Sequence, residues 1–174
     1  KTYLENVVVA AYGTYVREAT DLNLPAEVAA KPKPLEAPGL ISWEDALNTG
    51  HAPGPHTVGP NDLAVIPYSS GTTGQPKGCM HAHRAPMATA VQRAFWNITT
   101  TDSVQLCTLP FFHVTGMTGS MNSPIYAGST MVIMTRWDRD VAGKLIERYQ
   151  VTGWTNIVTM AVDFLSNPEL GKFD

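Results

Sequence analysis

The chain has 174 residues, of which 44% are hydrophobic and 16% are charged, a composition typical of a folded domain rather than a disordered segment. Twelve basic and fifteen acidic residues give a formal net charge of -3 without runs of either sign, which argues against a nucleic-acid-binding surface. No apolar run approaches the roughly 20 residues that a membrane helix needs. The composition therefore predicts an ordinary globular protein with no transmembrane segment and no nucleic-acid partner.

The cysteine content bears on the compartment. Cys79 and Cys107 are the two cysteines and lack the CxxC spacing of redox or metal motifs, so they fit free thiols in a reducing compartment. The first residues lack the small-residue cleavage site of a signal peptide. We therefore predict a cytoplasmic protein. Because the sequence does not begin with methionine, we also expect it to be part of a longer gene product.

Residues 1–60 have the pattern of an N-terminal segment with a long irregular connection. Residues 6–12 are apolar and rich in β-branched side chains, which predicts a short strand. A loop is expected from about Pro25, and the three prolines within residues 31–40 bias that stretch to extended, irregular backbone. Ser42 lies three residues before Asp45, which resembles a capping box and predicts the start of a short helix.

Strands and helices alternate from residue 61 to residue 174. The expected elements are a strand over residues 62–68, a helix in which Met87, Val91, Ala94 and Phe95 fall at helical spacing, a strand over 103–109, a helical segment over 111–122, a strand over 129–134, a helix capped by Asp138 or Asp140, a strand over 153–160 and a further helix from 161. This alternation predicts an α/β fold with a largely parallel sheet, flanking helices and right-handed crossovers.

The stretch YSSGTTGQPKG, residues 68–78, combines flexible backbone with many hydrogen-bond donors. Glycines let main-chain N–H groups approach a ligand closely, and hydroxyls add side-chain donors. A lysine at the far end and the dipole of the helix expected to follow would add positive charge. We therefore predict a phosphate-binding loop, whose residues are Ser69, Ser70, Gly71, Thr72, Thr73, Gly74 and Lys77. The alternative is a glycine-rich turn without a ligand.

The loop does not meet the Walker pattern of P-loop NTPases. Counted from Gly71, the residue before Lys77 is Pro76, and the residue after it is Gly78 rather than a serine or threonine. The sequence therefore argues against an ordinary P-loop NTPase.

Several motifs together resemble the adenylate-forming superfamily, which includes acyl-CoA synthetases, firefly luciferases and the adenylation domains of peptide synthetases. YSSGTTGQPKG resembles its phosphate-binding signature, and NDLAVIPY resembles the lead-in to it. CMHAHR resembles a segment that ends in Thr-His-Arg, with Ala82 in place of the threonine, and LPFFHVTGM resembles a Pro-aromatic-aromatic-His stretch. The resemblance runs from about Ser42 to the end, and Val158 stands where the family usually has proline.

The resemblance implies a two-step reaction in which a carboxylate attacks the α-phosphate of ATP and a thiol, most often that of coenzyme A, then takes the acyl group. It implies ATP, Mg²⁺ and coenzyme A as cofactors or substrates, with the loop residues on the β- and γ-phosphates. It places His113 beside the carboxylate, with Phe112 and Met117 in the acyl pocket. The most similar member is expected to be a fatty-acid–CoA ligase. An aryl-CoA ligase, a peptide-synthetase adenylation domain and a non-catalytic phosphate-binding scaffold are the alternatives.

Members of this superfamily are considerably longer than 174 residues. Residues 61–174 therefore resemble a partial AMP-binding domain, and the resemblance implies that the magnesium-holding glutamate, the ribose-binding aspartate and the C-terminal domain with its lysine lie outside this sequence. No metal ligand is expected here, and the chain alone is expected to be inactive. Sheet edges and apolar faces left uncovered would favour self-association.

Two other constellations could carry chemistry. His81 and His83 are spaced to share one face of a strand and could bind zinc together with His113, but no acidic partner is nearby in the sequence. Cys79 or Cys107 could act as a nucleophile with His113, although nothing supplies an orienting group. We favour buried structural thiols and no metal site.

Overall fold

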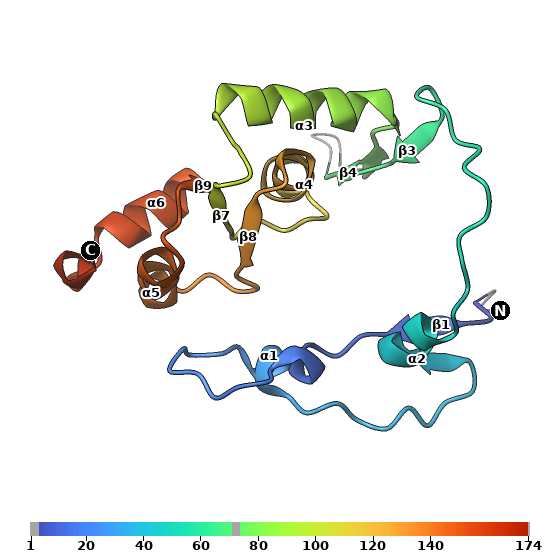
Figure 1. Cartoon of the computed structure of the whole chain (residues 1–174), viewed down its shortest axis with the longest axis horizontal. Coiled ribbons are helices and arrows are strands. Elements are labelled where there is room, and N and C mark those ends of the chain that lie inside the picture. Colours follow the sequence, from blue (N-terminus) through green and yellow to red (C-terminus); the bar gives the residue numbers. More distant parts are fainter. Residues whose placement is uncertain (1–3, 71–73, 174) are drawn as a thin grey trace. The chain divides into compact units, whose positions relative to one another are not determined.

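The computed structural model describes residues 4–70 and 74–173. The chain divides into two compact units, Lys1–His56 and Thr57–Asp174, and each is described by itself (Figure 1). None of the helices formed by the described residues combines the length and the apolar character needed to cross a membrane.

The first unit contains a small parallel strand pair and short helices. Its elements are β1 (Val7–Val9), η1 (Tyr12–Tyr15), α1 (Ala26–Ala29), β2 (Leu40–Ser42) and α2 (Trp43–Asn48). β1 is shorter than the predicted strand over residues 6–12 and pairs with β2 over three residues. The predicted helix start is confirmed: the Ser42 hydroxyl accepts from the Asp45 N–H at 2.9 Å and donates to the Asp45 carboxylate at 2.7 Å.

The second unit is built on a three-stranded parallel sheet in the order β8-β7-β9. Its strands are β7 (Val104–Cys107), β8 (Thr130–Ile133) and β9 (Gly153–Thr155). Leu106 and Cys107 are adjacent in the central strand and therefore point to opposite faces, and both are buried. A strand buried on both faces is typical of a parallel sheet covered by helices, so the predicted α/β fold is confirmed.

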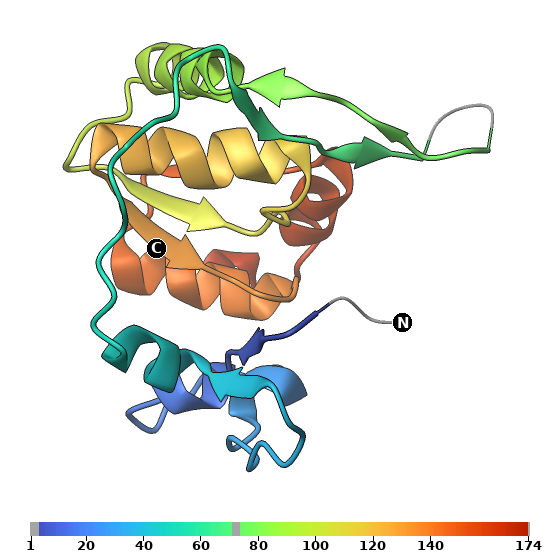
Figure 2. The same ribbon diagram turned by 90° about the vertical axis from the view of Figure 1, so that its right-hand side faces the viewer.

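Helices lie on both faces of this sheet (Figure 2). On one face, the π-helical segment η2 (Gly116–Asn122) contacts β7 and β9 and continues into α4 (Ser123–Ala127), and α3 (Arg84–Trp96) packs on this continuous helix. On the other face, α5 (Arg139–Tyr149) contacts β7, and α6 (Val158–Leu165) packs against α5. The short η3 (Leu170–Lys172) follows α6. The Asp138 side chain caps α5 by accepting from two backbone N–H groups, as one of the two predicted alternatives requires.

A narrow antiparallel ribbon leads to the glycine-rich stretch. It consists of β3 (Leu63–Val65) paired with β6 (His81–Ala82), followed by β4 (Tyr68–Ser69) paired with β5 (Lys77–Gly78). The prediction of one continuous strand over residues 62–68 is therefore wrong. The strand is interrupted at Ile66 and Pro67, where proline has no N–H to donate to a ladder.

The end of the sheet also differs from the prediction. β9 stops at Thr155 and α6 begins at Val158, so the predicted strand over residues 153–160 is too long. The helix is anchored at this point because the Ala161 N–H donates to the Ile157 carbonyl at 3.1 Å. Val158 is the first residue of α6, a position that also accommodates proline, so the substitution is compatible with this backbone.

A helix is present where it was predicted, but its predicted apolar face is only partly buried. Met87 and Phe95 are 57% and 76% exposed, whereas Ala90 and Ala94 are buried. Small residues are buried because α3 packs closely on η2 and α4. Beyond its end, Ile98 has a φ of 51°, a left-handed conformation that is unusual for a β-branched residue.

Candidate functional site

The glycine-rich stretch closes an antiparallel hairpin. Tyr68 lies opposite Gly78 and Ser69 lies opposite Lys77. Opposed residues of antiparallel strands project to the same face, so the Ser69 hydroxyl and the Lys77 ammonium are neighbours on one exposed face of the hairpin. Gly74 has a φ of +88°, which L side chains rarely adopt. The hairpin thus presents a hydroxyl donor beside a cation, a pair suited to an anionic oxygen.

Three residues of the predicted loop, Gly71, Thr72 and Thr73, lie outside the described residues. Their part in phosphate binding stays a prediction from the sequence. Ser70 and Gly74, which flank them, are both exposed.

The expected contribution of a helix dipole to this loop is wrong. Two chain segments, β5 and β6, intervene before α3 begins at Arg84. The Arg84 N–H donates to the Pro60 carbonyl at 2.9 Å and the His83 N–H to the Asp62 carbonyl at 3.0 Å. These partners precede β3, so α3 (green) starts at the opposite end of the ribbon from the β4–β5 pair (Figure 2). Because the dipole effect is confined to the first turn, it does not reach the loop.

His113 lies in the turn that follows β7. Its N–H donates to the Pro110 carbonyl at 3.0 Å, and its own carbonyl accepts from the Met117 N–H at 2.8 Å. Its Nδ1 accepts from the Thr115 N–H at 3.2 Å. In the neutral ring the proton is therefore on Nε2, which can donate to a ligand.

This turn is tight because Gly116 packs directly on the backbone that it returns to. A Cβ at Gly116 would lie 2.7 Å from the Pro110 carbonyl carbon and 2.9 Å from the Leu109 carbonyl oxygen, and still closer to the Pro110 oxygen. A side chain at this position would require the backbone to shift. The glycine therefore fixes how closely the helix start, and His113 with it, approaches the end of β7.

A cavity of about 410 Å³ brings the hairpin and this turn together. It is lined by Pro67, Tyr68, Ser69, Ser70, Cys79, His81, Phe112, His113 and Val114. Two predicted phosphate-binding residues thus share one cavity with the residues predicted to lie beside the carboxylate. None of the lining side chains is a carboxylate.

Met117 is separated from the other predicted residues. It lines a second, apolar cavity of about 340 Å³, together with residues of β3, α3 and α4. His83 also lines this second cavity, whereas His81 and His113 line the first. Among residues 4–70 and 74–173, no cluster of three or more histidine, cysteine or acidic side chains could hold a metal ion.

The two cysteines lie in different environments. Cys79 is exposed and lines the 410 Å³ cavity, so the expectation that it is a buried structural thiol is wrong. Cys107 is buried in β7 and its Sγ donates to the Ser120 carbonyl at 3.0 Å. Burial raises the pKa of the Cys107 thiol to about 11, which keeps it protonated and unreactive at neutral pH.

With the fold and this geometry established, comparison with known proteins assigns the family. Residues 6–174 match the family described as AMP-binding enzyme. The chain belongs to the AMP-binding enzyme family. Its predicted resemblance to the adenylate-forming superfamily is thereby confirmed.

Relatives within this family include plant and bacterial ligases. The chain is 33% identical over 122 residues to 4-coumarate–CoA ligase 4 of Arabidopsis thaliana. This match covers 67% of this chain and 21% of the relative. It is also 34% identical over 116 residues to a long-chain-fatty-acid–CoA ligase of Bacillus subtilis. That match covers 66% of this chain and 21% of the relative. The chain thus spans about a fifth of the length of these relatives.

Solved structures of the family share the fold. ATP-bound MatB from Rhodopseudomonas palustris matches with a TM-score of 0.66 and 25% identity, over 75% of this chain and 27% of that protein. The N-terminal domain of FACL13 from Mycobacterium tuberculosis, bound to an inhibitor, matches with a TM-score of 0.67 and 23% identity, over 98% of this chain and 42% of that domain. The second match bears on the fold alone.

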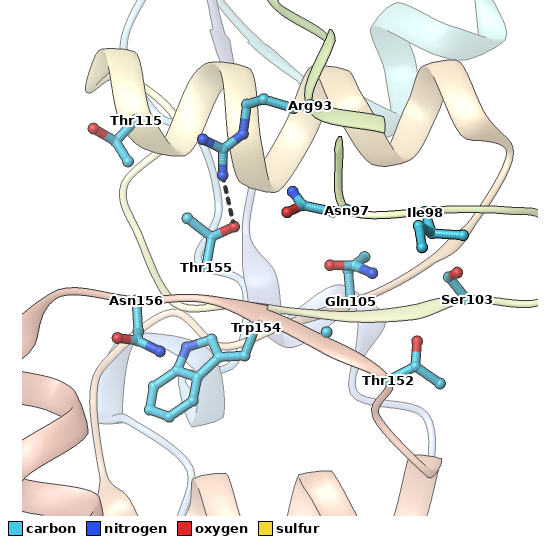
Figure 3. Close-up of a pocket in the computed structure, with 11 residues that line it drawn as sticks. Arg93, Asn97, Ile98, Ser103, Gln105, Thr115, Thr152, Trp154, Thr155 and Asn156 are labelled. Atoms are coloured by element: carbon cyan, nitrogen blue, oxygen red, sulfur yellow. Dashed lines mark hydrogen bonds between the residues drawn. The ribbon is translucent and has the colours of Figure 1, made fainter. Parts of the chain in front are cut away.

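One polar cavity in this AMP-binding chain was missed by the reasoning from sequence. It has a volume of about 680 Å³ and lies between the end of α3, β7 and β9 (Figure 3). The Arg93 guanidinium points into it and donates to the Thr155 hydroxyl at 3.2 Å. An arginine near the end of a helix is ordinarily solvated. Nothing in the sequence indicates that the Arg93 side chain is directed into a cavity.

We predict that thiol reagents distinguish the two cysteines. At pH 8, iodoacetamide should modify Cys79 quickly and Cys107 at least about 100-fold more slowly, because Cys107 is buried and about one in a thousand of its thiols is ionised. Peptide mass spectrometry of the folded chain measures both rates, and urea-unfolded chain is the control in which they converge. Similar rates in the folded chain would contradict the described burial.

We predict that Gly116→Ala destabilises the fold by about 1–3 kcal/mol, because the added methyl group overlaps the Pro110 carbonyl. Urea unfolding monitored by tryptophan fluorescence measures the change. Gly171→Ala is the matched control, since a Cβ there meets nothing within 4 Å. Equal effects of the two substitutions would show that the turn does not depend on the glycine.

Proposed function

We propose that this chain provides the phosphate- and carboxylate-facing part of an acid–thiol ligase of the acyl-CoA synthetase type. The whole protein would activate a carboxylic acid with ATP to an acyl-adenylate and transfer the acyl group to coenzyme A. The observation that carries the proposal is the 410 Å³ cavity, in which Ser69 and Ser70 of the hairpin face the same space as His113.

Each part of the cavity has a definite task in this proposal. Ser69 and Lys77, neighbours on one face of the hairpin, hold oxygens of the β- and γ-phosphates by charge-assisted hydrogen bonds. Ser70 and Gly74, with the predicted Gly71, Thr72 and Thr73, complete the phosphate loop. His113 donates from Nε2 to the substrate carboxylate, because its Nδ1 already accepts from Thr115. Nucleotidyl transfer depends mainly on such positioning and charge stabilisation.

The nature of the acid and of the other ligands rests on the relatives. Their names include 4-coumarate and long-chain fatty acids, and an ATP-bound structure is among the matches. We propose a fatty acid as substrate, with an aryl acid as the alternative; Phe112 and Met117 would contact its acyl part. Coenzyme A is the proposed acceptor. Because no carboxylate lines the cavity, we derive no step through Mg²⁺.

We further propose that residues 1–60 and 61–174 are parts of two segments of this larger enzyme and that the protein is cytoplasmic. The 174-residue chain alone is proposed to lack activity. The described lining of the 410 Å³ cavity offers hydroxyl and imidazole groups but no carboxylate that could hold a metal ion against the triphosphate.

In the full-length parent enzyme, we predict that Lys77→Ala lowers kcat/KM by about 10- to 100-fold, because one charge-assisted phosphate contact is lost, roughly 1–3 kcal/mol of transition-state stabilisation. ATP–pyrophosphate exchange with pooled fatty and aryl acids measures this rate. Lys172→Ala is the control, since Lys172 is exposed and pairs with Glu169 far along the chain.

Two results would contradict the proposal. Unchanged exchange by the Lys77→Ala enzyme would remove Lys77 from the phosphate site, and no exchange by the unaltered parent with any acid would exclude the ligase activity. Exchange catalysed by the 174-residue chain itself would show that the chain is not inactive.

We predict that the 174-residue chain self-associates, because the second unit exposes large apolar side chains. Phe95, Trp96 and Ile98 at the end of α3 are 76%, 89% and 82% exposed, and contiguous exposed apolar surface favours association. Light scattering across a concentration series should give a mass above the 18.8 kDa of one chain. Phe95→Ser with Trp96→Ser should shift the chain toward the monomer, and a monomeric unaltered chain would contradict the prediction.

A further inference from the structure

The 680 Å³ cavity contains a cation without an anionic partner. None of its lining residues is acidic. The Arg93 Nε has no hydrogen-bond partner and is inaccessible to solvent, and the Nη2 donates to the neutral hydroxyl of Thr155. Figure 3 shows the guanidinium directed toward β9, with Asn97 and Gln105 beside it and Thr115 across from it.

The surrounding structure is shaped to keep this guanidinium in place. A Cβ at Gly119 would lie 2.8 Å from the Arg93 Nη2 and 2.9 Å from both its Cζ and its Nε. These near-equal distances show that the guanidinium lies flat against the glycine of η2. The Nη2 also donates to the Thr155 hydroxyl, so the guanidinium is oriented before any ligand arrives.

A half-buried arginine whose Nε is shielded from solvent and has no hydrogen-bond partner favours an anion nearby. Taking a charged group out of water is costly unless it is paired and hydrogen-bonded, and arginine cannot lose its proton to avoid this cost. A carboxylate fits the planar fork of donors well. Ile98 and Trp154 add apolar surface, but most of the other lining side chains are neutral donors and acceptors, which suits a polar ligand end: Asn97, Ser103, Gln105, Thr115, Thr152 and Asn156.

Adjacent residues of the chain line the two cavities. His113 and Val114 line the 410 Å³ cavity and Thr115 lines the 680 Å³ cavity. The Thr115 N–H also donates to Nδ1 of the His113 ring. A substrate whose reacting carboxylate lies at His113 can therefore have its far end directed past the start of η2 toward Arg93.

We propose that Arg93 binds a second carboxylate at the far end of the substrate, so that the enzyme prefers a dicarboxylic acid to a plain monocarboxylic acid. This inference rests on the proposed ligase function and narrows its substrate class. Among the acids considered above, it selects those that carry a second carboxylate at the end remote from the reacting one. The same guanidinium could instead meet a carboxylate from elsewhere in the parent polypeptide, and the experiment separates these two sources.

The test compares saturated mono- and dicarboxylic acids of equal carbon number in ATP–pyrophosphate exchange by the full-length parent. We expect the unaltered enzyme to have a kcat/KM about 10- to 100-fold higher for the diacid at its best length, the range of a charge-assisted contact in a shielded site. Arg93→Met, which keeps the side-chain length without the charge, should abolish this preference by slowing the diacid alone. Arg93→Lys should retain part of it, mainly as a raised KM, and Arg17→Met is the control for loss of an exposed arginine.

The outcomes are distinguishable. No exchange with either series means that the ligase function itself fails. Exchange without a diacid preference, or an equal loss for both series in Arg93→Met with a lowered melting temperature, overturns the inference and assigns the partner carboxylate to the parent polypeptide. Gly119→Ala provides a second test, because it displaces the guanidinium without removing it and should also reduce the diacid preference.

Discussion

The close approach of Gly116 to the Pro110 carbonyl is the constraint on which both cavities depend. Because no side chain intervenes, the chain leaves β7, turns and enters η2 within a few residues. Alternate residues of this turn line different cavities: His113 lines the cavity beside the hairpin, and Thr115 lines the cavity that contains Arg93. A wider turn would move the imidazole away from Ser69 and Ser70, and the cavity that supports the proposed ligase chemistry would be lost.

The proposed phosphate loop is positioned by strand register, not by a helix. In a P-loop the helix that follows the glycines supplies free N–H groups and a dipole. Here the corresponding polypeptide returns as β5, and α3 begins only at the far end of the ribbon (Figure 2). Lys77 therefore lies beside Ser69 because the two are opposed in the ladder. A slip of the strand pairing by one residue would place Ser69 and Lys77 on opposite faces. The arrangement of the two side chains therefore depends on the register of this short hairpin.

Features set by local chemistry were predictable from the sequence. The caps at Ser42 and Asp138, the strands around Leu106 and Val132, and the α/β alternation depend on near neighbours and agree with the structure. The break at Pro67 is also a local feature, because proline has no N–H to donate to a strand ladder.

Features set by distant contacts were not predictable. The end of β9 depends on the adjoining strand, and the buried face of α3 depends on how closely η2 and α4 approach it. Arg93 is the clearest case, since its guanidinium packs against Gly119, a glycine 26 residues away, and its Nε is shielded from solvent. Within the helix sequence alone, nothing separates it from an ordinary surface arginine.

The linings of the two polar cavities have one feature in common. Among the described residues, neither lining includes a carboxylate, which is compatible with the anions proposed for them: phosphate oxygens near Ser69 and a carboxylate near Arg93. Binding an anion and activating it are different tasks, however. A triphosphate and an attacking carboxylate repel each other, and one lysine with several neutral donors offsets only part of that repulsion. In the proposed ligase, further positive charge near the hairpin would offset the rest of the repulsion. The contribution proposed for this chain is the orientation of its donors, which strand register and the Gly116 turn determine.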